Sequence, residues 1–237
     1  MIIVIPMAGE GSRFPKNLFP LQKPLLTCHG VTLLEYSLRS LPVPIASKVV
    51  FVMLKAQLDS RLTDLISQLC RGAPHEIVYL DKKTRGQAET IYQAIKDYPV
   101  DEELLVHNCD TALNSNWVFE ANTQGLIFTF KSQSLSYSYA KTNENGVVTQ
   151  VAEKEVISTN ASSGTYWFQS VELFLRSYNS YLVKQHNSEL FVAPIYQELI
   201  NTGAQVKIHE CQEVFPLGTP LDLEASSKNI HTWKPCW

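Results

Sequence analysis

Two glycines and two cations near the start of the chain could form a phosphate-binding loop. Gly9 and Gly11 follow an aliphatic run, and Ser12, Arg13 and Lys23 come after them. Glycine lets the backbone turn close to a ligand and aim N–H groups at it. A guanidinium can bind two phosphate oxygens, and a lysine supplies a mobile point charge. A plain turn carrying solvated surface cations has the same residue types, so both interpretations stay open at this point.

Two well-known nucleotide-binding patterns do not fit this loop. A dinucleotide-binding fingerprint needs a third glycine near residue 14, where Phe14 stands. A Walker A loop needs Gly-Lys followed by serine or threonine, which is absent there. The elements around the loop must therefore decide what it does.

The loop follows the first of four aliphatic segments that are typical of strands buried on both faces. These segments cover 2–6, 48–53, 76–80 and 104–110, and helical spacing separates them at 33–41, 58–70 and 88–95. This alternation predicts an α/β fold with a Rossmann-like, mostly parallel twisted sheet flanked by helices. Ligands of such sheets bind outside the carboxyl ends of the strands. The glycine loop, Gly86 and Asp110 are all predicted to lie at those ends.

The pattern changes after residue 115 and predicts a mixed, partly antiparallel portion. Strands are expected at 126–130, 136–139, 147–151, 164–168 and 206–209, with an Asn-Gly hairpin turn at 143–146 and helices at 171–178 and 190–201. Thr219 is predicted to cap a last helix over about 219–230, with Pro220 at its first position. We predict one domain over 1–237, with a nucleotide-binding part at about 1–115 and an acceptor-binding part at about 116–215.

Composition excludes several other classes of protein. The 237 residues carry a net charge of −3 without a long basic block, so we expect neither nucleic-acid binding nor attraction to an anionic membrane. The apolar N-terminal run is too short for a membrane span and lacks the basic start of a signal peptide. The five cysteines are scattered, which predicts reduced thiols in a cytoplasmic protein rather than disulfides or a zinc site.

Motifs along nearly the whole chain resemble the sugar-phosphate nucleotidylyltransferases, or nucleoside-diphosphate-sugar pyrophosphorylases. AGEGSRF and QKPLL resemble the family's glycine-rich loop and Pro-Lys-x-Leu motif, although Gln22 replaces the usual proline. The other matching motifs are Gly86-Gln87-Ala88, Asn108-Cys109-Asp110, Glu153-Lys154, the segment 163–168 and the segment 217–223. The opening PMAGEGSRF resembles members from capsule and surface-polysaccharide pathways.

The resemblance implies that an NTP and a sugar 1-phosphate, or a related phosphomonoester, combine to an NDP-sugar or NDP-alditol and pyrophosphate. Arg13 and Lys23 would neutralise the reacting phosphates, and Asp110 would bind Mg²⁺. The nucleotide would contact Ala8, Gly9, Gly11, Ser12, Gly86 and Gln87, and the acceptor would contact Asn108, Glu153, Lys154 and Gly164. A homo-oligomer is compatible with the sequence, which specifies neither the nucleobase nor the acceptor.

One departure concerns the metal site. Many family members place a second aspartate just before the final Gly-Thr, where this chain has Pro216 and Leu217. The second carboxylate could be missing, could be displaced to Asp222 or Glu213, or could be replaced by phosphate and water ligands. Asp222 could instead complete a capping box with Thr219.

Ordinary structural roles could also explain several of these residues. Asp110 could simply cap a helix, Lys154 could form an exposed ion pair, and Gln87 could merely open the helix after it. His107 is interpreted as a core histidine. Two further functions stay open, namely a metal-dependent GT-A glycosyltransferase and a non-catalytic nucleotide-binding relative. Asn108-Cys109-Asp110 lacks the first aspartate that such a transferase usually carries.

Overall fold

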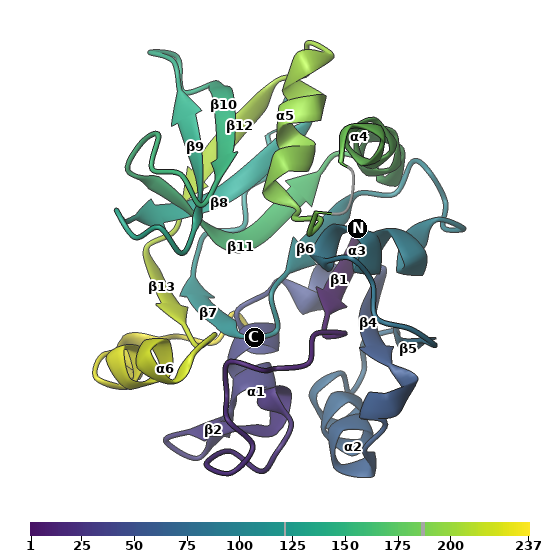
Figure 1. Ribbon diagram of the computed structural model, residues 1–237, viewed down its shortest axis with the longest axis vertical. Helices are drawn as coiled ribbons and strands as arrows, with labels where there is room; N and C mark the ends of the chain where they lie inside the picture. Colours follow the sequence, from purple (N-terminus) through teal and green to yellow (C-terminus); the bar gives the residue numbers. More distant parts are fainter. Residues whose placement is uncertain (121, 186–187) are drawn as a thin grey trace.

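The computed structural model describes residues 1–120, 122–185 and 188–237, and its centre is a nine-stranded mixed sheet (Figure 1). The main strand order is β10-β9-β11-β6-β1-β4-β5, and β8 pairs with β11 and β12 beside this path. The strands are β1 (Ile2–Pro6), β4 (Lys48–Leu54), β5 (His75–Leu80), β6 (Leu104–His107), β8 (Gly125–Lys131), β9 (Ser138–Thr142), β10 (Val148–Glu153), β11 (Asn160–Phe168) and β12 (Val206–Glu210).

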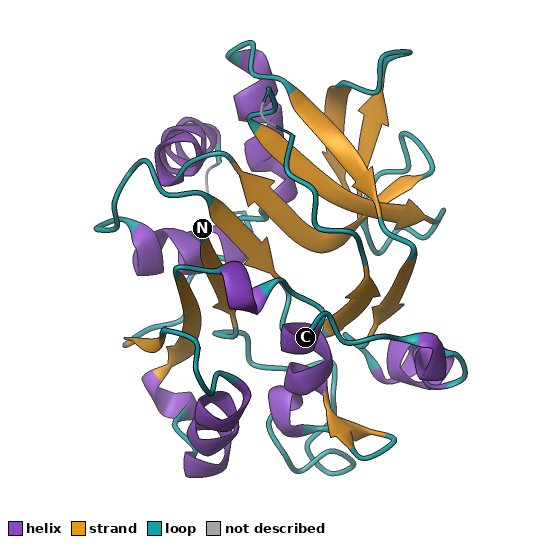
Figure 2. Ribbon diagram, turned by 180° about the vertical axis from the view of Figure 1, so that it is seen from behind, coloured by secondary structure: helices purple, strands orange, loops and turns teal. Residues whose placement is uncertain are grey.

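The first half of the chain forms the parallel part of this sheet, as predicted. β1 pairs in parallel with β4 and with β6, and β4 pairs in parallel with β5. The prediction that the third segment is buried on both faces was wrong, because β5 is the last strand of the order and none of its residues is fully buried. The intervening helices are α1 (Leu33–Arg39), α2 (Ser60–Leu69) and α3 (Gln87–Ile95). Seen from behind, strands cross the middle of the molecule with helices on both sides (Figure 2). The alternation of strand and helix in the sequence is therefore reproduced in space.

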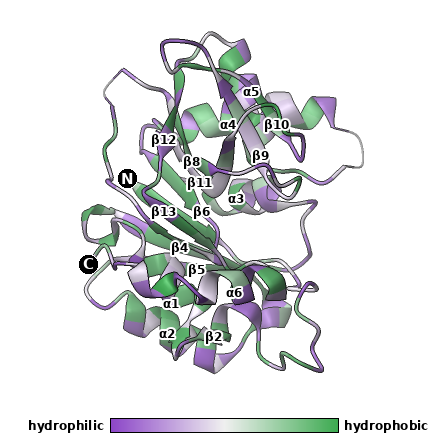
Figure 3. Cartoon of the chain, turned by 90° about the vertical axis from the view of Figure 1, so that its left-hand side faces the viewer, coloured by the Kyte–Doolittle hydropathy of each residue, from purple (hydrophilic) through white to green (hydrophobic). Residues whose placement is uncertain are grey.

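Residues of β1 alternate between two separate core layers. Ile2 and Val4 pack in the layer that contains side chains of α3 and α4 (Val171–Lys184). Ile3 and Ile5 pack in the layer that contains side chains of α1 and α2. Because successive strand residues point to opposite faces, a strand covered on both faces must be apolar throughout. Figure 3 shows the central strands accordingly coloured as hydrophobic.

The second half of the chain supplies the antiparallel part, also as predicted. β11 runs antiparallel to β6 on one side and to β8 on the other. β9 and β10 form a hairpin around the turn 143–146, in which Gly146 has φ 74°. Pairing of β11 with β6 therefore brings the acceptor-binding part that we predicted next to the parallel strands.

Some predicted boundaries were wrong. β6 ends at His107, so Asn108–Asp110 form a turn rather than strand residues. The helix expected from residue 190 is α5 (Ala193–Asn201). It begins later because the backbone N–H and C=O of Leu190 already bond to Arg85 and Ala88, at 3.0 Å each. The last helix, α6 (Pro220–Ser227), ends before residue 230 and is followed by the 3₁₀ turn η4 (Ile230–Thr232).

Short elements lie outside the sequence predictions. The strand β7 (Thr111–Asn114) pairs antiparallel with β13 (Glu213–Pro216), and β2 (Thr27–Cys28) pairs with β3 (Val31–Thr32). The 3₁₀ turns are η1 (Lys23–Leu25), η2 (Val43–Ile45) and η3 (Lys55–Gln57). All five cysteines are free thiols, as predicted. Among the described residues, no helix combines the length and apolar character needed to cross a membrane.

Candidate active site

Four loops meet at the carboxyl edge of the parallel strands. They follow β1, β4, β5 and β6, and direct contacts tie them together. Lys23 pairs with Asp110, the Gln57 side chain donates to the Gly9 carbonyl, and Gln87 donates to Asn108. Because ligands of α/β sheets bind at this edge, the convergence defines the candidate active site.

The centre of the site is an ion pair between Lys23 and Asp110. Lys23 is the first residue of η1, and Asp110 lies in the turn after β6. The Lys23 ammonium also donates to the Gly218 carbonyl at 3.0 Å. The two side chains are only 13% and 15% exposed. Burial acts to raise the pKa of Asp110, but the nearby charges of Lys23 and Arg13 outweigh it, so the pKa lies below its ordinary value. The carboxylate is therefore ionised at neutral pH.

Arg13 lies exposed beside this pair. Gly11 precedes it with φ 64°, and a Cβ there would lie 3.6 Å from the Cβ of Lys23, so the glycine turn runs next to the lysine. Within the described part of the chain, the Arg13 side chain makes no hydrogen bond or ion pair, although its charge lowers the pKa of Asp110. The guanidinium is available for an anionic ligand. Ser12 is also exposed, whereas Ala8 is buried.

The Asn108 side chain is held in place by two other predicted site residues. Its Oδ1 accepts a hydrogen bond from Gln87 Nε2, and its Nδ2 lies against Gly164. A Cβ at Gly164 would lie 2.1 Å from that Nδ2, and Gly164 has φ 81°. Gly164 is buried, so its part in the site is to leave room for the amide. Gln87 opens α3 and also orients Asn108.

The loop at Gly86 is fastened by a segment that the sequence did not point to. A Cβ at Gly86, where φ is 157°, would lie 2.5 Å from the carbonyl oxygen of Leu190. Leu190 accepts from Ala88 N–H and donates to Arg85 O, both at 3.0 Å. These are backbone contacts of an ordinary leucine, so the sequence carried no signal for them. Gly86 permits close backbone approach.

Glu153 and Lys154 lie together at the end of β10. Lys154 is exposed with φ 57°, a conformation uncommon for a residue with a side chain. Its ammonium lies 4.5 Å from the ring centre of Phe191, which neighbours Leu190. Burial is the main cause that raises the pKa of Glu153, which accepts a hydrogen bond from Ser138. Backbone strain of this kind is typical of functional sites.

The two candidate carboxylates for a second metal ligand lie in different places. A Cβ at Gly218 would lie 3.1 Å from Asp110 Oδ2 and 3.6 Å from Asp222 Oδ2, so both carboxylates border the same point. Thr219 caps α6 as predicted, because its Oγ1 accepts from Asp222 N–H at 3.1 Å. Asp222 Oδ2 accepts at 2.7 Å from the Thr219 hydroxyl, whereas a capping box would use the Thr219 backbone N–H. Glu213 instead bonds to Asn114 and Thr232. The geometry favours Asp222 over Glu213.

His107 is a core residue, as interpreted from the sequence. It is fully buried and bonds to Thr165 Oγ1 at 2.7 Å and to the Thr111 carbonyl at 2.9 Å. Burial lowers its pKa to about 4. The imidazole is therefore neutral at physiological pH and supports the end of β6.

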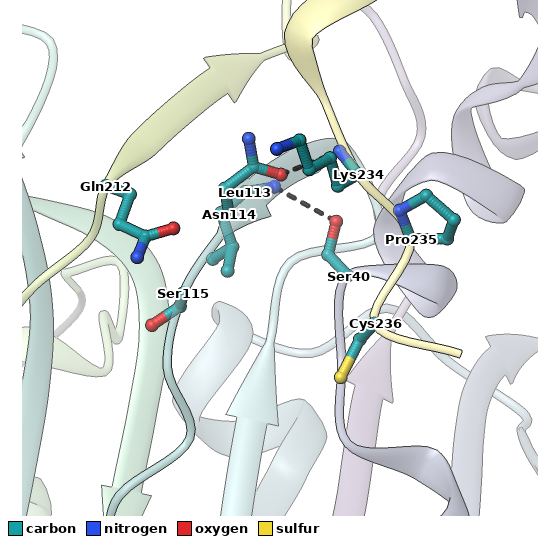
Figure 4. Close-up of a pocket in the computed structure, with 8 residues that line it drawn as sticks. All are labelled: Ser40, Leu113, Asn114, Ser115, Gln212, Lys234, Pro235 and Cys236. Atoms are coloured by element: carbon teal, nitrogen blue, oxygen red, sulfur yellow. Dashed lines mark hydrogen bonds between the residues drawn. The ribbon is translucent and has the colours of Figure 1, made fainter.

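A cavity of about 130 Å³ lies away from the predicted site residues, beside the C-terminal segment (Figure 4). Its lining is Ser40, Leu113, Asn114, Ser115, Gln212, Lys234, Pro235 and Cys236. Ser40 Oγ accepts from Leu113 N–H, and Asn114 Oδ1 accepts from Lys234 N–H. These groups already hold the C-terminal segment in place, so we do not assign the cavity to the reaction.

Comparison with known proteins identifies the family to which this fold belongs. Residues 3–128, more than half of the chain, match the family of MobA-like NTP transferase domains. The chain belongs to this family. The match covers the glycine loop, Lys23 and Asp110. Of the predicted functions, the comparisons thus support the nucleotidyltransferase.

Solved structures extend the likeness to the whole chain. A nucleoside-diphosphate-sugar pyrophosphorylase from Vibrio cholerae is 31% identical with a TM-score of 0.83, and the match covers 96% of this chain and 100% of that one. The inositol-1-phosphate CTP transferase from T. maritima is 16% identical with a TM-score of 0.75, covering 98% and 97%. The latter shares the fold. No curated protein sequence matches the chain significantly.

Proposed function

We propose that the protein transfers a nucleotidyl group from an NTP to a sugar 1-phosphate or related phosphomonoester. The products are an NDP-sugar, or NDP-alditol, and pyrophosphate, made for surface polysaccharides. One observation carries the proposal: an exposed guanidinium, a lysine and an ionised carboxylate meet at the strand ends. The likeness to the Vibrio cholerae pyrophosphorylase also supports the proposal.

In this reaction an oxygen of the acceptor phosphate attacks the α-phosphorus of the NTP, and the bond to the β-phosphate bridging oxygen breaks. Both partners are anions, so positive charge is the main requirement for catalysis. Arg13 would bind the departing β- and γ-phosphates, and Lys23 would exchange its bond to Asp110 for the α-phosphate. No protein nucleophile is required, and no side chain gains or loses a proton in this step.

Mg²⁺ fits the carboxylates at this site. Asp110 and Asp222 both border Gly218, and carboxylate and phosphate oxygens are the ligands that Mg²⁺ prefers. Within the described residues, no group of three or more His, Cys, Asp or Glu side chains could hold a metal ion. When bound, Mg²⁺ would supply charge that offsets the negative triphosphate. Asp110, and more weakly Asp222, would hold it.

The acceptor would lie against the second half of the chain. Lys154 would bind its phosphate. Glu153 would accept hydrogen bonds from its hydroxyl groups, and Asn108 would hydrogen-bond to them through its amide. The exposed ammonium of Lys154 and the fixed amide of Asn108 support this assignment. Gly86 and Gln87 would lie beside the base and ribose.

A pyrophosphate-release assay tests the proposal. The protein is incubated with Mg²⁺, each of ATP, GTP, CTP, UTP and dTTP, and a panel of sugar 1-phosphates and alditol phosphates. We expect release of pyrophosphate with one NTP and one acceptor class, and its loss in Lys23→Ala. Sugar transfer from a ready-made nucleotide sugar, without pyrophosphate release in any combination, would contradict the proposal and favour a glycosyltransferase.

A further inference from the structure

We propose that Gln57 is a positioning residue that fixes the phosphate-binding loop, defined here as residues 8–23, for NTP binding. The inference rests on the proposed function of that loop. Gln57 is the last residue of η3, the 3₁₀ turn that follows β4. It therefore lies in the turn after the neighbouring strand β4 and not in the phosphate-binding loop itself.

Gln57 connects three points with three hydrogen bonds. Its side-chain Oε1 accepts from Leu54 N–H at 2.8 Å, which anchors the amide to the end of β4. Its Nε2 donates to the Gly9 carbonyl at 2.7 Å. Its main-chain carbonyl accepts from Gln22 Nε2 at 2.9 Å. One residue thus holds the loop near both of its ends, next to the glycine turn and directly before Lys23.

The loop main chain has few other attachments near its first end. Among the described residues, the main chain of residues 8–13 accepts one hydrogen bond from outside the loop, namely the bond from Gln57 to the Gly9 carbonyl. A second hydrogen bond, from Phe14 N–H to the Gly11 carbonyl, lies within the loop. Glu10 adds an ion pair with Lys83, but both side chains are more than half exposed. Exposed pairs of this kind contribute little.

The attachment matters because Gly9 and Gly11 have more backbone freedom than other residues. A loop that must be ordered when the NTP arrives loses conformational entropy at that moment, which weakens binding. A loop that is held in advance avoids this loss. By binding both ends, Gln57 also sets the separation between Arg13 and Lys23, which must reach different phosphates of one triphosphate.

The test compares Gln57→Met with Gln68→Met. Methionine has a similar shape and no charge, so the first variant removes the side-chain bonds without adding electrostatic repulsion. Gln68 lies exposed on α2 without a side-chain hydrogen bond in the described structure, and provides the matched control. Gln22→Ala removes only the second link and keeps the inference testable if Gln57→Met does not fold.

The first measurement needs no substrate. Arg13 and Lys16 are exposed sites for trypsin within the loop. We expect Gln57→Met to be cut there several-fold faster than the parent and Gln68→Met, with an unchanged rate at sites elsewhere. The second measurement is steady-state pyrophosphate release. Since one hydrogen bond is worth roughly a two- to tenfold change in an equilibrium constant, the KM for NTP should rise by that factor while the acceptor KM stays constant.

Two results would overturn the inference. In the first, Gln57→Met and Gln22→Ala both have the same loop-cleavage rate and the same KM for NTP as the control Gln68→Met. In the second, the KM for NTP and the KM for the acceptor rise equally and the Tm falls, which indicates general destabilisation. If the parent binds no NTP, the proposed function fails, whereas faster loop cleavage still reports on the attachment alone.

Discussion

Replacing Lys23 with methionine should destabilise the protein because the Asp110 carboxylate would lose its ion-pair partner. The two side chains are 13% and 15% exposed, so water can replace the lost ammonium only in part. Removing one partner of a buried pair costs about 3–5 kcal/mol, and the remaining exposure of Asp110 reduces our expectation to about 2–4 kcal/mol. For a chain of this size, the Tm should fall by about 5–15 °C.

The stability difference between the parent and Lys23→Met should depend on pH. In the parent, burial acts to raise the pKa of Asp110, and Lys23 and Arg13 hold it below its ordinary value. The ion pair therefore stabilises above the unfolded pKa of about 3.9, and that contribution is lost as pH falls through the folded pKa. In Lys23→Met, the charge of Arg13 remains but the larger contribution of Lys23 is lost, so we expect burial to raise the pKa of Asp110 above its ordinary value. The variant then loses stability as pH rises through that raised pKa.

Urea unfolding between pH 4.5 and 8, followed by fluorescence of the four tryptophans, measures this difference. The free-energy gap between the parent and Lys23→Met should widen as pH rises. The double variant Lys23→Met/Asp110→Asn lacks the carboxylate, so the gap should shrink and its pH dependence should disappear. A constant gap below about 0.5 kcal/mol across this range would refute the reasoning, because the pair would then behave like an exposed one.

Three further predictions address other parts of the site. Burial lowers the pKa of His107 from 6.5 to about 4. Between these pH values the unfolded chain binds more protons than the folded one, so the parent should lose about 3 kcal/mol of unfolding free energy as the pH falls from 6.5 to 4. Urea titrations of His107→Gln should not show this loss. Gly164→Ala places a Cβ 2.1 Å from Asn108 Nδ2 at φ 81°, so both Tm and kcat should fall. The control Gly146→Ala, at φ 74° with open space around it, should lose only about 1–2 kcal/mol to backbone strain and keep its kcat. Equal behaviour of the two variants would contradict the steric argument. Arg13→Ala should lower kcat/KM for NTP by about 100-fold or more. The Tm should fall much less than in Lys23→Met, because the Arg13 side chain is exposed and its charge contributes less than that of Lys23 to the low pKa of Asp110. A lower Tm with normal turnover would assign Arg13 a structural role.

The local elements of this protein were predictable from its sequence. Runs of aliphatic residues predicted the parallel strands, since a strand covered on both faces is mostly apolar. The buried His107 of β6 is an exception that requires two hydrogen bonds. Thr219 and Pro220 predicted the start of α6 because capping depends on residues within one turn. The strand ends then followed from topology, which is why Asp110 and the glycine loop could be expected on one edge.

Short and long-range features were not predictable in the same way. β7 and β13 are four residues each and are separated by about a hundred residues, so neither carries a periodic pattern of its own. Gln57, Leu190 and Phe191 act through contacts with distant segments. Nothing in a single glutamine marks it as the partner of Gly9 and Gln22.

The sequence by itself determined the class of fold, the cation-bearing loop and the carboxylate at the end of β6, because local spacing and hydrophobic pattern suffice for these. Only the tertiary structure decided that Lys23 meets Asp110, that Gly164 lies against Asn108, and that Asp222 rather than Glu213 borders the same point as Asp110. Such pairings depend on which strands become neighbours and in what register, and packing of the whole chain sets that register.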